Sequence, residues 1–139
     1  MIQRIQSIWF LLAAAACFLT LKLPFYNGNV IQPDQTRRFE HLTAMSNIIL
    51  MILTMLLGLG IVILIFLFKD RKLQLKLTVL AILLSVTNIV LFFNQIKKFV
   101  EGSFDITSPI VFTVPIFLIL AARGIYKDEK LIKSLNRLR

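Results

Sequence analysis

Histidine and cysteine, the side chains that most often bind metals or attack substrates, each occur only once in this sequence, as His41 and Cys17. A single cysteine excludes an intramolecular disulfide and a cysteine-based metal cluster. A lone histidine has no second histidine with which to hold zinc. Cys17 also lies in an apolar segment with no base nearby in the sequence, so we interpret it as a small packing residue. We therefore expect no cofactor, no metal site and no enzymatic activity.

Charge is missing from the interior of four apolar segments, which we interpret as membrane spans. The segments are residues 5–23, 42–68, 77–96 and 106–122. Apolar residues make up 58% of the chain, above the roughly 45–50% of a soluble domain. The uncharged stretch Ile48–Phe68 would cover about 31 Å as a helix, close to the thickness of a hydrocarbon core. We predict an all-α fold: a four-helix transmembrane bundle made by one domain, residues 1–139.

The absence of charge within the spans also bears on transport. Proton-coupled exporters place an ionisable side chain inside the membrane, so this class is disfavoured. A pore or a carrier for a neutral solute stays open.

The positive charges indicate an orientation. With both termini in the cytoplasm, the two tails and the turn at residues 69–76 hold 11 Lys and Arg residues, against 5 in the other two loops. Loops rich in Lys and Arg stay in the cytoplasm, so we predict that both termini are cytoplasmic. The net charge of +9 flanks apolar segments, which favours anionic lipid headgroups over nucleic acid as its partner.

Three polar residues, Ser85, Thr87 and Asn88, fall within the third apolar segment. An unpaired amide in hydrocarbon costs several kcal/mol, so Asn88 should face another helix. One interpretation is an interhelical hydrogen bond, worth about 0.6–2 kcal/mol in membranes. The other is a ligand contact or a pore lining. We favour the first.

The tail, residues 123–139, alternates apolar residues with cations at helical spacing. We predict a basic amphipathic helix that lies on an anionic leaflet, with Asp128 and Glu129 in its first half, as the helix dipole prefers. The alternative is a docking helix for a cytoplasmic partner protein. The cations of this candidate lipid or partner surface are Lys127, Lys130, Lys133, Arg137 and Arg139.

A polar cluster, Arg37, Arg38, Glu40 and His41, precedes the second span. A pH-sensing or metal-binding role for His41 would need further ligands. We interpret the cluster as the solvated start of the second helix, with a Glu–Arg pair.

The start of the chain, MIQRIQS at residues 1–7, and its end, RGIYKDEKLIKSLNRLR at residues 123–139, resemble a family of small bacterial proteins. That family is catalogued as a domain of unknown function with four spans in the inner membrane. The resemblance covers the whole chain in length and span number, and it implies an inner-membrane location. It brings no catalytic residues, and the segment at residues 24–41 matches no family pattern.

Three functions remain, in this order. The first is a non-enzymatic accessory or scaffold subunit of a membrane complex, which binds other membrane proteins or further copies of itself. The second is a small oligomeric channel or carrier lined by Ser85, Thr87 and Asn88 and bent at Pro115. The third, a lipid-modifying enzyme, would depend on His41 with Glu40 or on acids at the membrane interface.

Overall fold

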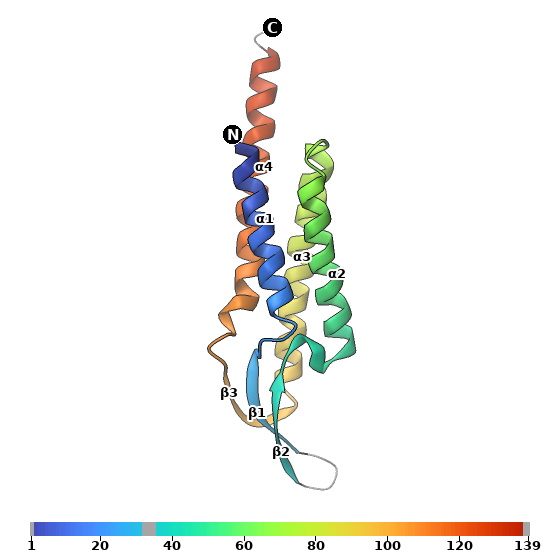
Figure 1. Ribbon diagram of the computed structural model, residues 1–139, viewed down its shortest axis with the longest axis vertical. Helices are drawn as coiled ribbons and strands as arrows, with labels where there is room; N and C mark the ends of the chain where they lie inside the picture. The colour runs from blue at the N-terminus through green and yellow to red at the C-terminus, as the bar shows by residue number, and fades with distance from the viewer. Residues whose placement is uncertain (1, 32–35, 138–139) are drawn as a thin grey trace.

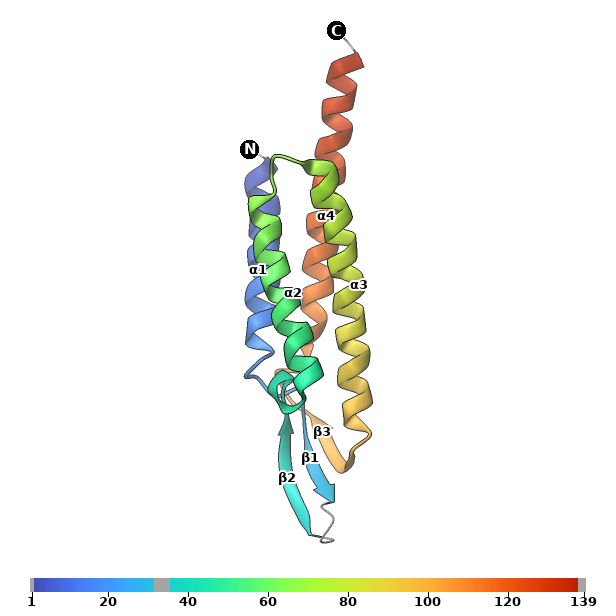
Figure 2. The ribbon, with the colours of Figure 1, turned by 90° about the vertical axis from the view of Figure 1, so that its right-hand side faces the viewer.

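Four helices of the computed structural model run side by side along its long axis, and a small β-sheet closes one end (Figure 1). The structure describes residues 2–31 and 36–137, with side chains for residues 5–31 and 36–132. Helix α1 packs on α2 and α4, and α3 packs on the same two helices, so the four form a ring (Figure 2). The helices are α1 (Ile2–Leu19), α2 (Ile48–Phe66), α3 (Arg71–Ile96) and α4 (Pro109–Arg137).

Both termini and the α2–α3 turn lie at one end of the bundle, which we call the terminal end, and the sheet lies at the other, the sheet end (Figure 1). This arrangement brings residues 69–76, which include the first turn of α3, to the same end as the two tails.

The sheet contradicts the all-α prediction. Strands β1 (Tyr26–Ile31), β2 (Arg37–Leu42) and β3 (Phe99–Phe104) pair antiparallel in the order β2-β1-β3. The strands come from two loops that lie far apart in the sequence, so the β1–β3 pairing leaves no local signal. Aromatic and β-branched residues in both loops suit strands once they meet.

The second helix begins later than predicted, and the polar cluster before it is not a helix start. Arg37, Arg38, Glu40 and His41 lie on β2, followed by a 3₁₀ turn, η1 (Ala44–Ser46). Asn47 then caps α2, because its side-chain oxygen accepts a hydrogen bond from the Ile49 N–H at 2.9 Å. This cap fixes the first residue of α2 at Ile48. Helix α3, in contrast, begins at Arg71, earlier than the predicted residue 77.

The fourth helix does not end where the predicted span ends. Helix α4 continues to Arg137 as one helix, and its last turns project beyond the other three helices (Figure 1). The tail is therefore helical through Arg137, as predicted, but it continues α4 instead of starting a helix of its own. Asp128 and Glu129 lie well inside α4, so the helix dipole does not explain their positions.

The sheet packs on the helices through aromatic rings. Phe25, 1% exposed, packs against Phe92 of α3 with ring centroids 4.8 Å apart and the rings tilted by 48°. Gly28 and Gly102 pair across β1 and β3, and a Cβ at Gly102 would lie 2.6 Å from the Tyr26 ring. The two glycines therefore let aromatic rings lie flat against the strands.

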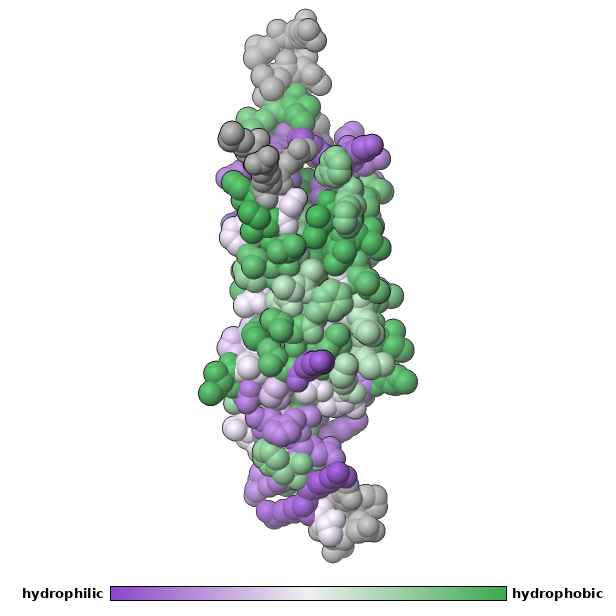
Figure 3. Space-filling view, viewed as in Figure 1, coloured by the Kyte–Doolittle hydropathy of each residue, from purple (hydrophilic) through white to green (hydrophobic). Residues whose placement is uncertain are grey.

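The bundle is apolar inside and outside. Its core is built from large side chains between small residues of α1, such as Ala13, which let the helices approach closely. Outward-facing residues of α2, such as Ile48 and Phe66, are 69% and 72% exposed. Figure 3 shows this apolar surface as a broad band between more polar ends.

Three of the helices are long and apolar enough to cross a membrane: Ile48–Phe66, Arg71–Ile96 and Pro109–Ile132. The apolar part of α1, Ile5–Leu19, is shorter. Length and composition thus define a membrane protein.

Candidate functional site

A hydrogen bond between two polar side chains joins α2 to α3 inside the bundle. The Asn88 side-chain amide donates to the Thr54 hydroxyl at 3.1 Å, and that hydroxyl lies 2.7 Å from the Leu50 carbonyl oxygen. Asn88 is 5% exposed and Thr54 is fully buried. Both polar groups of an otherwise apolar interface are therefore satisfied by protein, which is the interhelical arrangement that membranes favour.

Ser85 and Thr87, the other two candidate residues of the third apolar segment, donate hydrogen bonds within α3. Ser85 is buried, and its hydroxyl donates within α3 to the Ile82 carbonyl at 2.7 Å. Thr87 is exposed on the outer face of α3 and donates to the Leu83 carbonyl at 3.0 Å. The three residues therefore do not line one path: Ser85 and Asn88 face the interior, whereas Thr87 faces outward.

A small cavity lies beside Asn88 and Ser85, between all four helices. It leaves about 10 Å³ for the centre of a water molecule, about what one water requires. Cys17 borders the cavity, and its thiol donates to the Thr54 carbonyl at 3.3 Å. The space admits one water and no solute, so within a single copy these side chains hold helices together.

A second hydrogen bond, which the sequence did not predict, joins α1 to α4 at the terminal end. The Gln6 amide donates to the Asp128 carboxylate at 2.5 Å, and the two side chains are 7% and 6% exposed. Gly124 makes room for this bond, because a Cβ there would lie 2.8 Å from Gln6 Cγ. Between α2 and α3, the Gln74 amide donates to the Leu64 carbonyl at 2.8 Å. Polar side chains thus tie the helices together at this end.

The predicted lipid or partner surface lies on the C-terminal turns of α4. Lys127 and Lys130 are exposed. Lys133 and Arg137 lie on the same helix, with side chains outside the described part of the chain, and Arg139 lies outside the described residues.

A hydrogen-bonded chain crosses one face of the sheet. His41 Nδ1 donates to the Asn27 side-chain oxygen at 2.7 Å, and the Asn27 amide donates to Asp105 at 2.7 Å. The Thr107 hydroxyl and backbone N–H also donate to Asp105, at 2.6 and 3.1 Å. These bonds, Thr107 first and then Asn27 and the nearby His41, lower the pKa of the Asp105 carboxyl from its usual 3.8. The network holds the loop before α4 against the sheet.

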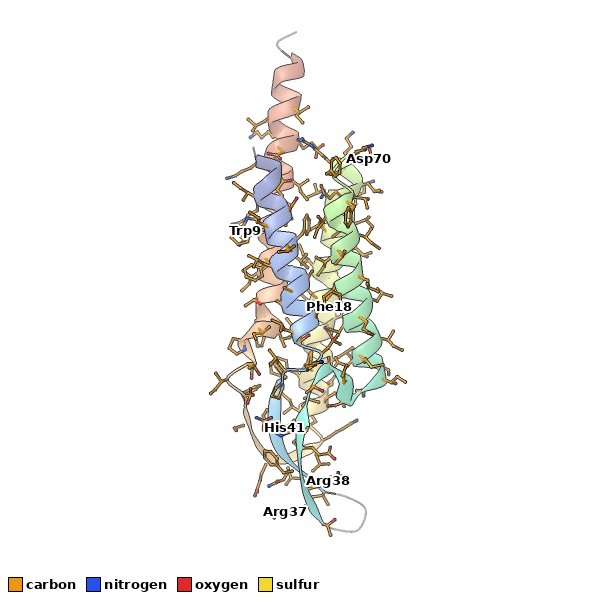
Figure 4. All side chains as sticks on the ribbon, in the orientation of Figure 1. Trp9, Phe18, Arg37, Arg38, His41 and Asp70 are labelled. Atoms are coloured by element: carbon orange, nitrogen blue, oxygen red, sulfur yellow. The ribbon has the colours of Figure 1, made fainter. Side chains whose placement is uncertain are left out.

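The same face carries an exposed ion pair between Arg37 of β2 and Glu101 of β3, 3.4 Å apart. Figure 4 shows Arg37, Arg38 and His41 on β2 at the sheet end, and Asp70 at the opposite end of the bundle. Among the described residues, His, Cys, Asp and Glu form no group of three that would hold a metal ion.

The fold and these sites define a helical membrane protein with a small sheet at one end, whose interior polar groups bind one another. Comparison with known families agrees with the resemblance seen at the two ends of the chain. The protein belongs to the DUF4293 family, a domain of unknown function, which it matches over residues 2–138. No curated protein and no solved structure matches the chain.

Proposed function

We propose that the protein is a four-span inner-membrane protein with both termini in the cytoplasm, and that it acts as a non-enzymatic accessory or scaffold subunit of a membrane complex. The terminal end would then lie in the cytoplasm and the sheet outside the membrane on the other side. The gathering of the cationic turn and both tails at one end supports this orientation.

Support for α1 as a fourth span comes from the backbone after Leu19. The N–H groups of Thr20 and Leu23 donate to Ala16 and Leu19 at 3.2 and 2.9 Å, so helical turns continue to Leu23. Residues 5–23 together span about 28 Å at about 1.5 Å per residue, close to the hydrocarbon thickness.

The observation that carries the scaffold role is the projecting part of α4. It extends a helix beyond the bundle, presents cations such as Lys130, and is fixed at its base by the buried Gln6–Asp128 hydrogen bond. A rigid, charged helix outside the bilayer is a suitable contact for a second protein. The buried polar side chains described above, in contrast, already form hydrogen bonds with other groups of the protein.

Isolation of the protein from its native membranes in a mild detergent tests this role. We expect native mass spectrometry to show the full-length chain in a larger assembly with other subunits. A chain that runs as a free monomer in native membranes would contradict the proposal. The channel alternative is tested separately, because flux through liposomes that is equal for the native chain and Asn88→Leu removes Asn88 from any conduction path.

A further inference from the structure

A groove opens between α3 and α4 near the terminal end, where the two helices lie side by side (Figure 2). The groove is open to the molecular surface, and its volume is about 490 Å³. Leu75, Ile82 and Ile119 form its apolar walls.

The mouth of the groove is cationic. Arg123 and Lys127 line it together with Tyr126. The two cations are four residues apart on α4, so they lie on the same face and repel each other. Both are exposed, and no ion pair or hydrogen bond of either side chain is found among the described residues. An anion between them would relieve this repulsion.

The apolar and cationic parts follow one another along the helix axis. Ile119 precedes Arg123 by about one turn of α4, and Arg123 precedes Lys127 by about one more. A ligand that fills the groove therefore has an apolar tail directed toward the middle of the bundle and an anionic group at its end.

We propose that this groove binds an anionic phospholipid, with one acyl chain against Leu75, Ile82 and Ile119 and the phosphate between Arg123 and Lys127. This inference rests on the membrane orientation in the proposed function, because it places the cations at the headgroup level of the cytoplasmic leaflet. Basic pockets between helices on that side of a membrane bind lipid headgroups. A free phosphate ion would leave the apolar walls unused.

Native mass spectrometry of the full-length protein in neutral detergent tests the site, with added phosphatidylglycerol or phosphatidylcholine of identical acyl chains. We expect phosphatidylglycerol to remain bound with the higher affinity. The double variant Arg123→Gln, Lys127→Gln should weaken phosphatidylglycerol binding about 30-fold, since each cation near an anionic lipid is worth about 1 kcal/mol. The matched control is Lys72→Gln, Lys76→Gln, an exposed pair with the same spacing on α3 that does not line the groove. It should bind lipid as the native chain does.

A second variant tests the apolar part with the charges intact. Ala122→Phe places a ring in the groove and should also weaken lipid binding. Ala15→Phe, an exposed position on α1, is its control. Equal lipid binding by all variants, or equal affinity for the two lipids, would overturn the proposal. A further outcome would also overturn the proposal. If inorganic phosphate displaces the lipid and Ala122→Phe does not change lipid binding, the site binds a headgroup without an acyl chain.

The two proposals fail separately. A protein that assembles with other subunits but shows no preference for phosphatidylglycerol leaves the scaffold role standing and removes the lipid site. A monomer that retains phosphatidylglycerol through Arg123 and Lys127 does the reverse.

Discussion

Single polar side chains connect the helices of this bundle at places where the rest of the interface is apolar. The Asn88–Thr54 bond predicts a measurable coupling: Asn88→Ala and Thr54→Val should each destabilise the protein, and the double variant should cost less than their sum by about 0.6–2 kcal/mol. Unfolding in mild detergent by titration with sodium dodecyl sulfate measures all four proteins.

The control for this cycle is Thr87→Val. Thr87 faces outward and bonds only within its own helix, so its effect should add to that of Thr54→Val. Strictly additive effects of Asn88→Ala and Thr54→Val would instead show that the interhelical bond does not contribute.

The Asp105 carboxylate predicts a pH dependence. Because folding lowers its pKa from 3.8, the ionised form stabilises the folded state above that pH. This contribution is lost as the pH falls below 3.8 through the lowered pKa. The melting temperature of the native chain should therefore fall more between about pH 4 and about pH 2 than that of Asp105→Asn.

Glu101→Gln serves as the comparison for the pH experiment. Its carboxylate is 63% exposed in the surface pair with Arg37, and such pairs contribute little. This variant should keep the native pH dependence. If Asp105→Asn also keeps it, the hydrogen bonds to Asp105 do not set the acid stability.

At the level of helices and strands, the stability of the sheet depends on the close contact between β1 and β3 at Gly28 and Gly102. Gly102→Ala should cost about 1–3 kcal/mol, because the new methyl group meets both the Tyr26 ring and the Asn27 carbonyl oxygen. Gly60→Ala in α2 is the control, since nothing lies within 4 Å of its Cβ and alanine favours a helix. Unfolding titrations compare the two, and equal stabilities would contradict the sheet geometry.

The stability of the C-terminal turns of α4 depends on the Gln6–Asp128 hydrogen bond, which holds them to α1. Asp128→Leu leaves the Gln6 amide without its partner, so amide hydrogens over residues 125–132 should exchange about tenfold faster or more. Asp128→Asn retains an oxygen acceptor and should exchange at nearly the native rate. Unchanged exchange in Asp128→Leu would show that α1 does not hold this segment.

The elements that the sequence predicted are those with a local signal. Long uncharged runs in the sequence predicted the apolar helices α2, α3 and α4. Each helix overlaps its predicted span. The predicted start of α2 was wrong because the Asn47 cap, and not the beginning of the apolar run, sets the first residue of the helix. Among the candidate residues, the burial of Asn88 followed from the cost of an unpaired amide in hydrocarbon.

What the sequence did not reveal depends on distant partners. Gln6 and Asp128 are 122 residues apart, and Asn27 and Asp105 are 78 apart. No periodicity links such residues, and each alone is an ordinary polar residue with no sign of its partner in the sequence around it. The pairing of β3 with β1 was missed for the same reason, since the two strands come from different loops.

At the scale of the whole molecule, the arrangement of the two ends predicts which residues each side of a membrane exposes. In a Cys17→Ser background, Ser103→Cys at the sheet end should react with a membrane-impermeant maleimide in intact cells. Lys72→Cys and Lys130→Cys at the terminal end should react only after the membrane is permeabilised. All three positions are exposed. Labelling of all three from one side would contradict the four-span orientation.

The bond between Gln6 and Asp128 has a consequence for biosynthesis. A ribosome makes Gln6 early and Asp128 122 residues later, so in the four-span arrangement that we propose the first helix enters the membrane long before its main partner exists. Its apolar segment is shorter than those of the other three helices, and it is therefore the least able to stay inserted alone. In that arrangement, a chain released before the last helix is made lacks the α1–α4 contact that closes the ring.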